Sequence, residues 1–393
     1  MKWASTVSIR TGADENIRQC VDDVRKGLGA PPDLALLFVS RHFSEDYAGI
    51  ALSVQEKLAC TVLIGCSAGG VIGAGKEVEG MPGISLTAGI LPGVTIHPFH
   101  VDQVDLPSLD GSPRLWEDLI GVTTREAPHF LLFADPFTFS PEEWLSGFDF
   151  AYPGASKVGG LASAASQRGE NVLFLNGKML RSGMVGVALA GDVVLDTAVA
   201  QGCYAVGPVL HVTECEENKL MELDHQPAME VVAEILNGLE PEEQERVQHS
   251  LFIGLGMDAM KETSTHGDFL IRNLIGADAE AGHLFVAARL HEGQTVQFHL
   301  RDARASASDL NAVLSDFAGR HEEQHYAGAF LFSCMGRGQM LYGRSNHDAE
   351  RFRHFLGDLP LGGFFCSGEI GPVGGTTYLH GYTSSFGIIG PRD

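Results

Sequence analysis

Cysteine, glycine and arginine occur together in a short segment that follows the apolar run AFLFS. The segment is CMGRG, which begins at Cys334 and includes Gly336, Arg337 and Gly338. Glycines in such a turn can expose backbone N–H groups, and the planar guanidinium of arginine suits a carboxylate or a phosphate. These residue types therefore predict a turn that binds an anion.

A second glycine-rich segment, CSGEIGPVGG, begins at Cys366 and includes Ser367 and Glu369. Its glycines allow the backbone to approach a ligand closely, and Glu369 can pair with a ligand amine. His380 and Thr383 follow in the next expected strand and can add directional hydrogen bonds. The ligand-binding residues that we expect are Cys334, Gly336, Arg337, Gly338, Cys366, Ser367, Glu369, His380 and Thr383.

Three other interpretations of these residues are open. In a cysteine-dependent enzyme or redox switch, Cys334 or Cys366 would be a thiolate activated by Arg337 and His380. In a zinc site, both cysteines would act with His380 and Glu369, although their spacing fits no known zinc motif. In a purely structural interpretation, the cysteines lie in the core and Glu369 pairs with Arg337. The ligand-binding interpretation assigns no catalytic residue, no metal and no cofactor.

Familiar catalytic motifs do not account for the chain. Residues 70–76 carry the glycines and the lysine of a phosphate-binding P-loop, but Glu77 stands where serine or threonine must coordinate magnesium. The sequence contains no HExxH and no GxSxG motif, which define zincins and α/β-hydrolases. Binding is therefore favoured over standard catalysis.

Composition excludes several classes of partner and location. The chain has 50 acidic and 27 basic residues, a formal charge of −23 that repels nucleic acids and anionic membranes. No apolar run reaches the roughly 18 residues of a membrane span, and the start resembles a strand more than a signal peptide. The seven cysteines are dispersed and form no CxxC pair, which indicates reduced thiols. We expect a cytoplasmic protein.

One order of elements recurs three times along the chain. In each copy an apolar strand leads through a helix to a second strand, a Gly/Ser/Cys turn and a glycine-studded strand. The copies begin at ALLFV, FLLFA and AFLFS, and their turns are GCSAGG, VGGLASAAS and CSGEIGPVGG. The Cys-Ser pairs at 66–67 and 366–367 suggest how the first and third turns align. This repetition predicts a mixed α/β fold built from strand-helix-strand-strand units.

A polar break at 214–227 interrupts this pattern. We place a domain boundary near residue 220 and expect two pseudo-related domains, at 1–220 and 221–393. The first copy has Gly69-Gly70-Val71 after its turn, so it lacks a counterpart of Glu369. The functional site is accordingly expected in the C-terminal domain.

Several long segments resemble a known family. The runs FLFSCMGRGQMLYG, PLGGFFCSGEIGPVGG and LHGYTSSFGII are similar to the FIST C-terminal domain. LIGCSAGG and QGCYAVGPVLHVTECEENKLMELDHQPAMEV resemble the FIST N-terminal domain. The resemblance implies a stand-alone pair of FIST domains, at 1–220 and 221–393.

The resemblance also implies a function. It indicates an intracellular sensory module of signal transduction that binds a small ligand, such as an amino acid or a derivative, and has no established catalytic residues. Its output would pass to a separate signalling protein. The ligand, that partner and the oligomeric state are left open.

Overall fold

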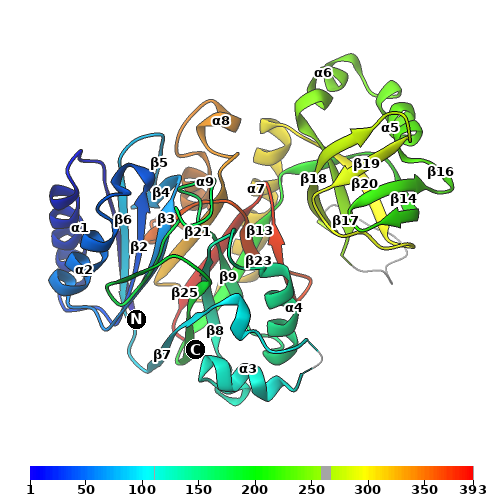
Figure 1. Ribbon diagram of the computed structural model, residues 1–393. Coiled ribbons are helices and arrows are strands. Elements are labelled where there is room, and N and C mark those ends of the chain that lie inside the picture. The colour runs from blue at the N-terminus through cyan, green and yellow to red at the C-terminus, as the bar shows by residue number, and fades with distance from the viewer. Residues whose placement is uncertain (110, 258–266, 393) are drawn as a thin grey trace. The chain divides into compact units, whose positions relative to one another are not determined.

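The computed structural model describes residues 1–109, 111–257 and 267–392, and in the helix near residue 245 it describes the backbone alone at 245–249 (Figure 1). The chain forms two compact units. Unit 1 comprises Met1–Ala200, Leu310–Leu379 and Thr383–Asp393, and unit 2 comprises Gln201–Asp309 and His380–Tyr382. The mixed α/β fold and the two-part organisation expected from the sequence are confirmed. The predicted boundary near residue 220 separates sequence domains. Sequence domains and compact units need not coincide, so this boundary stays a prediction.

Unit 1 contains three six-stranded sheets of the same plan. In each, a central strand pairs in parallel with the second strand of its copy and antiparallel with the last. The first sheet has the order β1 (Lys2–Ser8), β6 (Ile84–Ile90), β2 (Leu34–Ser40), β3 (Val62–Ala68), β10 (Leu173–Leu175) and β11 (Lys178–Leu180). The second has β24 (Thr376–His380), β23 (Glu369–Val373), β9 (Lys157–Leu161), β8 (His129–Ala134), β12 (Met184–Gly191) and β7 (Val94–Val101). The third has β13 (Val194–Ala200), β25 (Ser384–Gly390), β21 (Gly328–Cys334), β22 (Leu361–Cys366), β4 (Gly70–Gly73) and β5 (Lys76–Glu79).

A glycine at one register position marks all three copies. A glycine of the second strand faces a leucine of the central strand in the pairs Leu37–Gly65, Leu132–Gly159 and Leu331–Gly363. A Cβ atom on any of these repeat glycines would lie 1.8 Å from the leucine carbonyl oxygen, so no other residue fits. The internal repeat is therefore visible in the strand pairing as well as in the sequence.

The repeat glycines correct the alignment suggested by the Cys-Ser pairs. Three residues beyond its repeat glycine, the third copy has Cys366 where the first copy has Ala68. Cys66, one residue beyond its glycine, corresponds instead to Phe364. The two Cys-Ser pairs are therefore shifted by two residues in register and are not equivalent positions.

Each sheet is completed by a hairpin from another copy. The hairpin β4–β5 follows β3 in the chain but pairs with β22. In the same way β10–β11, which follows β9, pairs with β3, and β23, which follows β22, pairs with β9. No copy can satisfy all its strand edges alone, so the three copies fold as one body.

The phenylalanine after each of the three leucines lies at the centre of unit 1. The ring centroids of Phe38 and Phe133 are 5.2 Å apart, and those of Phe133 and Phe332 are 5.7 Å apart. Helices pack on the other faces of the sheets, with α1 (Ala13–Leu28) and α2 (Tyr47–Leu58) on the first sheet (Figure 1). The second sheet is covered by α3 (Pro113–Ile120) and α4 (Pro141–Ala151), and the third by α7 (Ala303–Arg320) and α9 (His347–Leu356).

Unit 2 is an antiparallel barrel. Neighbouring strands pair with one another around the barrel, and β14 closes the barrel by pairing with both β20 and β15. Two helices, α5 (Ala228–Asn237) and α6 (Pro241–Ser250), connect strands of the barrel. The strands are β14 (Cys203–Glu216), β20 (Thr295–Arg301), β17 (Leu251–Gly256), β18 (Phe269–Asp278), β19 (His283–Val286) and β15 (Lys219–Leu223), with the short β16 (Gln226–Pro227) beside β15.

Candidate functional site

The second strands of the three copies end at one place in unit 1, which we call the strand-end site (residues 67–71, 161–165 and 366–369, with the loop 334–338). The backbone N–H of Ser163 donates to the Ser67 carbonyl at 3.2 Å, and that of Ser367 donates to the Leu161 carbonyl at 3.1 Å. The Ser163 hydroxyl accepts from the Gly69 N–H at 2.9 Å and donates to the Phe365 carbonyl. Ligands of α/β proteins commonly bind where strands end in this way.

The loop after β21 and the residue after β22 give the strand-end site an exposed edge. Ser367 is exposed, Met335 is 43% exposed, and Cys334 and Gly336 are half-buried. The Met335 N–H donates to the Cys366 carbonyl at 3.0 Å, which fastens this loop to the end of β22. A small molecule can therefore reach the hydroxyl of Ser367 and the polar atoms of the loop.

Glu369 follows this exposed edge in the chain and is a buried acidic residue. Its side chain is fully buried, and Oε2 accepts hydrogen bonds from the Thr383 hydroxyl at 2.8 Å and the Thr383 N–H at 3.2 Å. Strand pairing shows that the corresponding residues of the other copies are Val71 and Leu173, both in the apolar core. Burying a carboxyl group costs free energy. Among the three copies, the third carries a carboxyl group at this position and the other two carry apolar side chains.

Arg337 is fully buried, and its guanidinium group forms hydrogen bonds within the protein. Nε lies 2.7 Å and Nη2 3.3 Å from the two oxygens of Asp348, and Nη2 also donates to the Tyr342 hydroxyl at 2.6 Å. Asp348 accepts a further bond from Ser384 at 2.6 Å and lies 2.8 Å from Nδ1 of His347. The predicted anion partner of the arginine is thus supplied by the chain itself.

The charge of Arg337 also governs how Asp348 ionises. Burial by itself would raise the pKa of Asp348. The guanidinium and the hydrogen bonds from His347, Arg337 and Ser384 outweigh burial, and they hold this pKa well below its usual range. Asp348 is therefore ionised throughout the physiological pH range and keeps the 334–342 segment in place.

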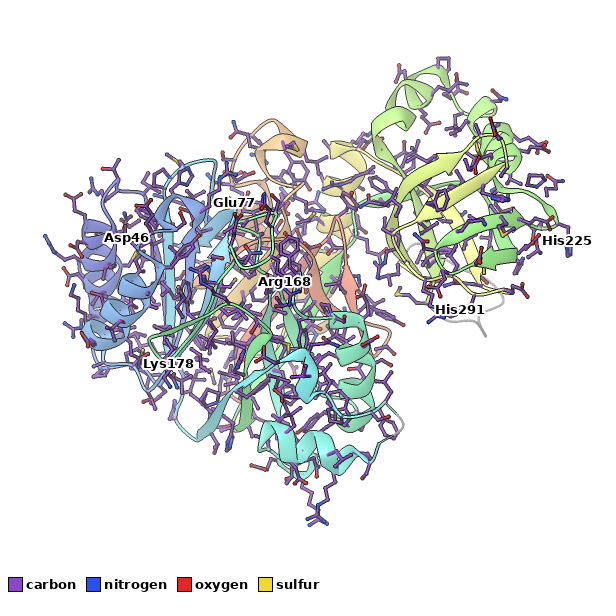
Figure 2. All side chains as sticks on the ribbon, viewed as in Figure 1. Asp46, Glu77, Arg168, Lys178, His225 and His291 are labelled. Carbon is purple, nitrogen blue, oxygen red and sulfur yellow. The ribbon has the colours of Figure 1, made fainter. Side chains whose placement is uncertain are left out.

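Two glutamates of β5 extend this cluster. Glu77, labelled in Figure 2, is 6% exposed. Its Oε1 accepts from the Ala349 N–H at 2.8 Å in the first turn of α9, and its Oε2 has no partner among the residues described. Burial, reinforced by the charge of Asp348, raises the pKa of Glu77 to about 8. Glu79 accepts from the Gln339 N–H at 2.9 Å, and its pKa is also raised by burial.

Gly338 allows this contact with Glu79. Its φ is +66°, and a Cβ atom there would lie 2.4 Å from the Glu79 carboxylate. The glycine predicted as a ligand contact therefore has a structural task of its own, which is to let β5 approach the loop.

The thiols near the site are poor candidates for nucleophiles. Cys366 is fully buried and faces Cys334 across the parallel strands. Burial, with a smaller contribution from Glu369, raises the pKa of Cys366 well above that of an ordinary thiol, and burial does the same for Cys66. Because the thiolate is the reactive form, an enzyme or redox switch would depend on the partly exposed Cys334.

The remaining candidates divide between the two units. Thr383 lies in unit 1 beside Glu369, whereas His380, the buried last residue of β24, is grouped with unit 2. In the described part of the chain, no group of three or more His, Cys, Asp or Glu side chains is placed to hold a metal ion. The zinc interpretation thus finds no ligand cluster there.

Four residues of this region were not singled out from the sequence: Ser163, Glu77, Asp348 and Ser384. Ser163 stands four residues after its repeat glycine, as Ser367 does, so the correct register would have identified it. The sequence marked Glu77 only as a departure from the P-loop pattern. Asp348 and Ser384 carry no local signal, because their importance comes from Arg337.

These features define a two-unit α/β protein with a threefold internal repeat and a polar site where the repeated strands end. The chain belongs to the FIST family: the FIST N domain matches residues 33–226 and the FIST C domain matches residues 228–372. FIST domains are sensory domains of signal transduction that bind small ligands. No helix among residues 1–109, 111–257 and 267–392 is both long and apolar enough to cross a membrane.

Relatives of similar length occur in mycobacteria. Uncharacterized protein Rv0628c of Mycobacterium tuberculosis is 35% identical over 363 residues, which is 92% of each chain. Uncharacterized protein Mb0898c of Mycobacterium bovis is 34% identical over 385 residues, covering 98% of this chain and 97% of its own. Human F-box only protein 22 is similar over a shorter stretch, with 32% identity over 82 residues, or 21% of this chain and 20% of its own.

Proposed function

We propose that this protein is a sensory module that binds a small amine-bearing ligand at the strand-end site. The observation that supports this most directly is Glu369, a buried acid at a position where the other two copies have Val71 and Leu173. The Glu369 carboxylate accepts two hydrogen bonds from Thr383, and its negative charge is complementary to a ligand ammonium group. An amino acid or a derivative fits this chemistry.

In this proposal the nine candidate residues have different roles. Cys334, Gly336 and Ser367 contact the ligand at the exposed edge, and Glu369 binds its amine. Thr383 and the Arg337–Asp348 pair are positioning residues, because they hold Glu369 and the loop. Gly338 and Cys366 shape the loop and the end of β22. His380 lies in unit 2 and is left out, since the proposal is confined to unit 1.

The proposed setting is the cytoplasm, and the proposed output passes to a separate signalling protein. Both proposals rest on the family and on the charge of −23, which disfavours nucleic acids and anionic membranes as partners.

Calorimetry of the full chain against a panel of amino acids and small amines tests this function. We expect a ligand whose affinity falls about tenfold or more in Glu369→Gln, because a charged hydrogen bond is lost, and less in Ser367→Ala. The matched control is Glu56→Gln on the exposed face of α2, which should bind normally. Thermal unfolding of each variant checks the fold, and Ser367 is exposed, so that variant will fold. A ligand that binds Glu369→Gln and Ser367→Ala as tightly as the wild type contradicts the proposal.

A further inference from the structure

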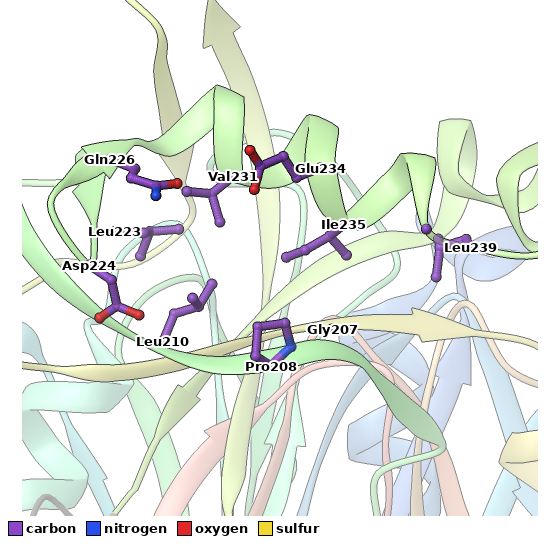
Figure 3. Close-up of a pocket in the computed structure, with 11 residues that line it drawn as sticks. Gly207, Pro208, Leu210, Leu223, Asp224, Gln226, Val231, Glu234, Ile235 and Leu239 are labelled. Atoms are coloured by element: carbon purple, nitrogen blue, oxygen red, sulfur yellow. The ribbon is translucent and has the colours of Figure 1, made fainter.

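Unit 2 has a groove of its own between the barrel and helix α5. Its volume is about 460 Å³, and it lies between β14, the turn after β15 and α5 (Figure 3). Cavities of a few hundred Å³ are the size that small ligands occupy. All residues that line it belong to unit 2.

A bulge in β14 creates this groove. Val206 pairs with Phe298 and Leu210 with Val296, so three residues of β14 (207–209) lie opposite the single residue Gln297 of β20. Gly207 has a φ of +72°, and a Cβ atom there would lie 3.0 Å from Ile235, so glycine lets the bulge approach α5. The Gln297 side-chain amide donates to the Gly207 carbonyl at 3.0 Å and holds the bulge in place. The hollow is thus a built feature of the barrel wall.

The floor of the groove is continuous with the apolar core of the barrel. Leu210, Leu223 and Val231 line the groove and belong to that core, with exposed fractions of 7%, 0% and 7%. Ile235 and Leu239 are half-buried and pack against the same core. A hydrocarbon chain placed here would rest on these core residues and cover the exposed parts of Ile235 and Leu239.

The charged groups of the groove are acidic. Figure 3 shows the carboxylate of Glu234 on the α5 side and that of Asp224 at the turn after β15, and no basic residue lines the groove. Asp224 accepts from the His211 backbone N–H at 3.1 Å, and its Oδ1 also lies 3.3 Å from Nδ1 of the His211 ring, so Glu234 is the principal charged group of the groove. The Glu234 carboxylate has no hydrogen bond or ion pair within the described residues. Residues 201–309 contain 19 acidic and 7 basic side chains, so the surrounding field also favours a cation.

We propose that this groove binds a small amphipathic amine. Its hydrocarbon part would lie on Leu210, Val231 and Ile235, and its ammonium group would meet Glu234, with Asp224 adding negative charge. An anion would be repelled by both carboxylates, and a neutral alcohol would lose the charged contact. This is a second site in the other unit and does not depend on the strand-end site.

Titrations of the full chain with hexylammonium, 1-hexanol and hexanoate test the proposal by methyl NMR. We expect hexylammonium to shift the methyl signals of Leu210, Val231 and Ile235, hexanol to bind about tenfold more weakly, and hexanoate not to bind. Glu234→Gln should weaken hexylammonium binding about tenfold, because the charged partner is removed. Glu230→Gln, an exposed glutamate of the same helix that does not line the groove, is the matched control and should bind normally.

Three outcomes overturn the proposal: equal affinity for hexanol and hexylammonium, unchanged binding in Glu234→Gln, and loss of binding in Glu369→Gln alone. The last would place the amine at the strand-end site and support the function proposed there. Loss in Glu234→Gln alone supports the groove, and the strand-end site is then judged by its own ligand panel. Glu234 is exposed, so its replacement should not disturb folding.

Discussion

Glu77 carries a buried carboxyl group that is influenced by the charges of Asp348, Glu79 and Arg337. Burial and the nearby negative charge of Asp348 raise its pKa to about 8, above the 4.5 of an ordinary glutamate. Between these two values the folded protein holds a proton that the unfolded chain releases. The contribution of Glu77 to the free energy of unfolding is therefore largest below pH 4.5 and falls as the pH rises towards 8.

Glu77→Gln should remove this dependence on pH. We expect the wild type to lose stability relative to this variant by up to about 1 kcal/mol per pH unit between pH 5.5 and 8. Urea unfolding at pH 5.5, 7 and 8.5 measures the effect, with Glu56→Gln as an exposed control. Asp348 does not interfere, because its lowered pKa makes stability fall at acidic pH, below this window. Identical pH slopes for the wild type and Glu77→Gln would contradict the prediction.

The parallel strand pairs of unit 1 depend on the three repeat glycines. At each, the backbone of the neighbouring strand occupies the space of a side chain. The helices and strands around these glycines follow from ordinary apolar patterns. The close approach of the two strands, in contrast, requires glycine, because a side chain has no space there. The glycines are therefore the residues on which the elements of each copy depend most directly.

Gly363→Ala should destabilise the protein by about 3 kcal/mol or more, because its Cβ would lie 1.8 Å from the Leu331 carbonyl oxygen. Gly49→Ala is the matched control, because it is the same substitution at an exposed position. Gly49 is exposed in α2 with open space around its Cβ position, so alanine there should raise stability by up to about 1 kcal/mol. Urea unfolding of both variants tests the pair. A Gly363→Ala variant of wild-type stability would show that the strands separate without cost.

The exchange of hairpins ties the three sheets of unit 1 into one body. Each sheet takes an edge from another copy, and Phe38, Phe133 and Phe332 meet at the centre. Opening one sheet therefore breaks hydrogen bonds in a second. Unit 1 should behave as a single cooperative structure although it contains three repeats.

Hydrogen exchange of the full chain, followed by mass spectrometry at increasing urea, tests this cooperativity. The central strands β2, β8 and β21 should lose protection together, with opening free energies equal within about 1 kcal/mol. A copy that opens well before the other two would show that its hairpin contacts contribute little. The outer strands are excluded from the comparison, because edges fray in any sheet.

Much of this architecture was accessible from the sequence alone. The repeat, the mixed α/β class, the family and the glycine-rich strand ends were all predicted, because apolar periodicity and glycine-rich turns are local properties of the chain. The helix expected at 45–58 is α2 (Tyr47–Leu58), and that at 141–148 is part of α4 (Pro141–Ala151). The chain also showed that the first copy lacks a counterpart of Glu369.

Tertiary structure decided which groups meet. Glu77 binds the start of α9 from 272 residues away, and Arg337 binds Asp348 in preference to remaining open for a ligand. The Cys-Ser pairs suggested an alignment that is two residues out of register, since identical letters do not report strand pairing. Packing between segments that are distant in the sequence determines which side chains contact one another. Local propensity does not encode this packing. The sequence by itself determined the repeated elements and where polar residues gather, and the fold determined which of those residues bind one another.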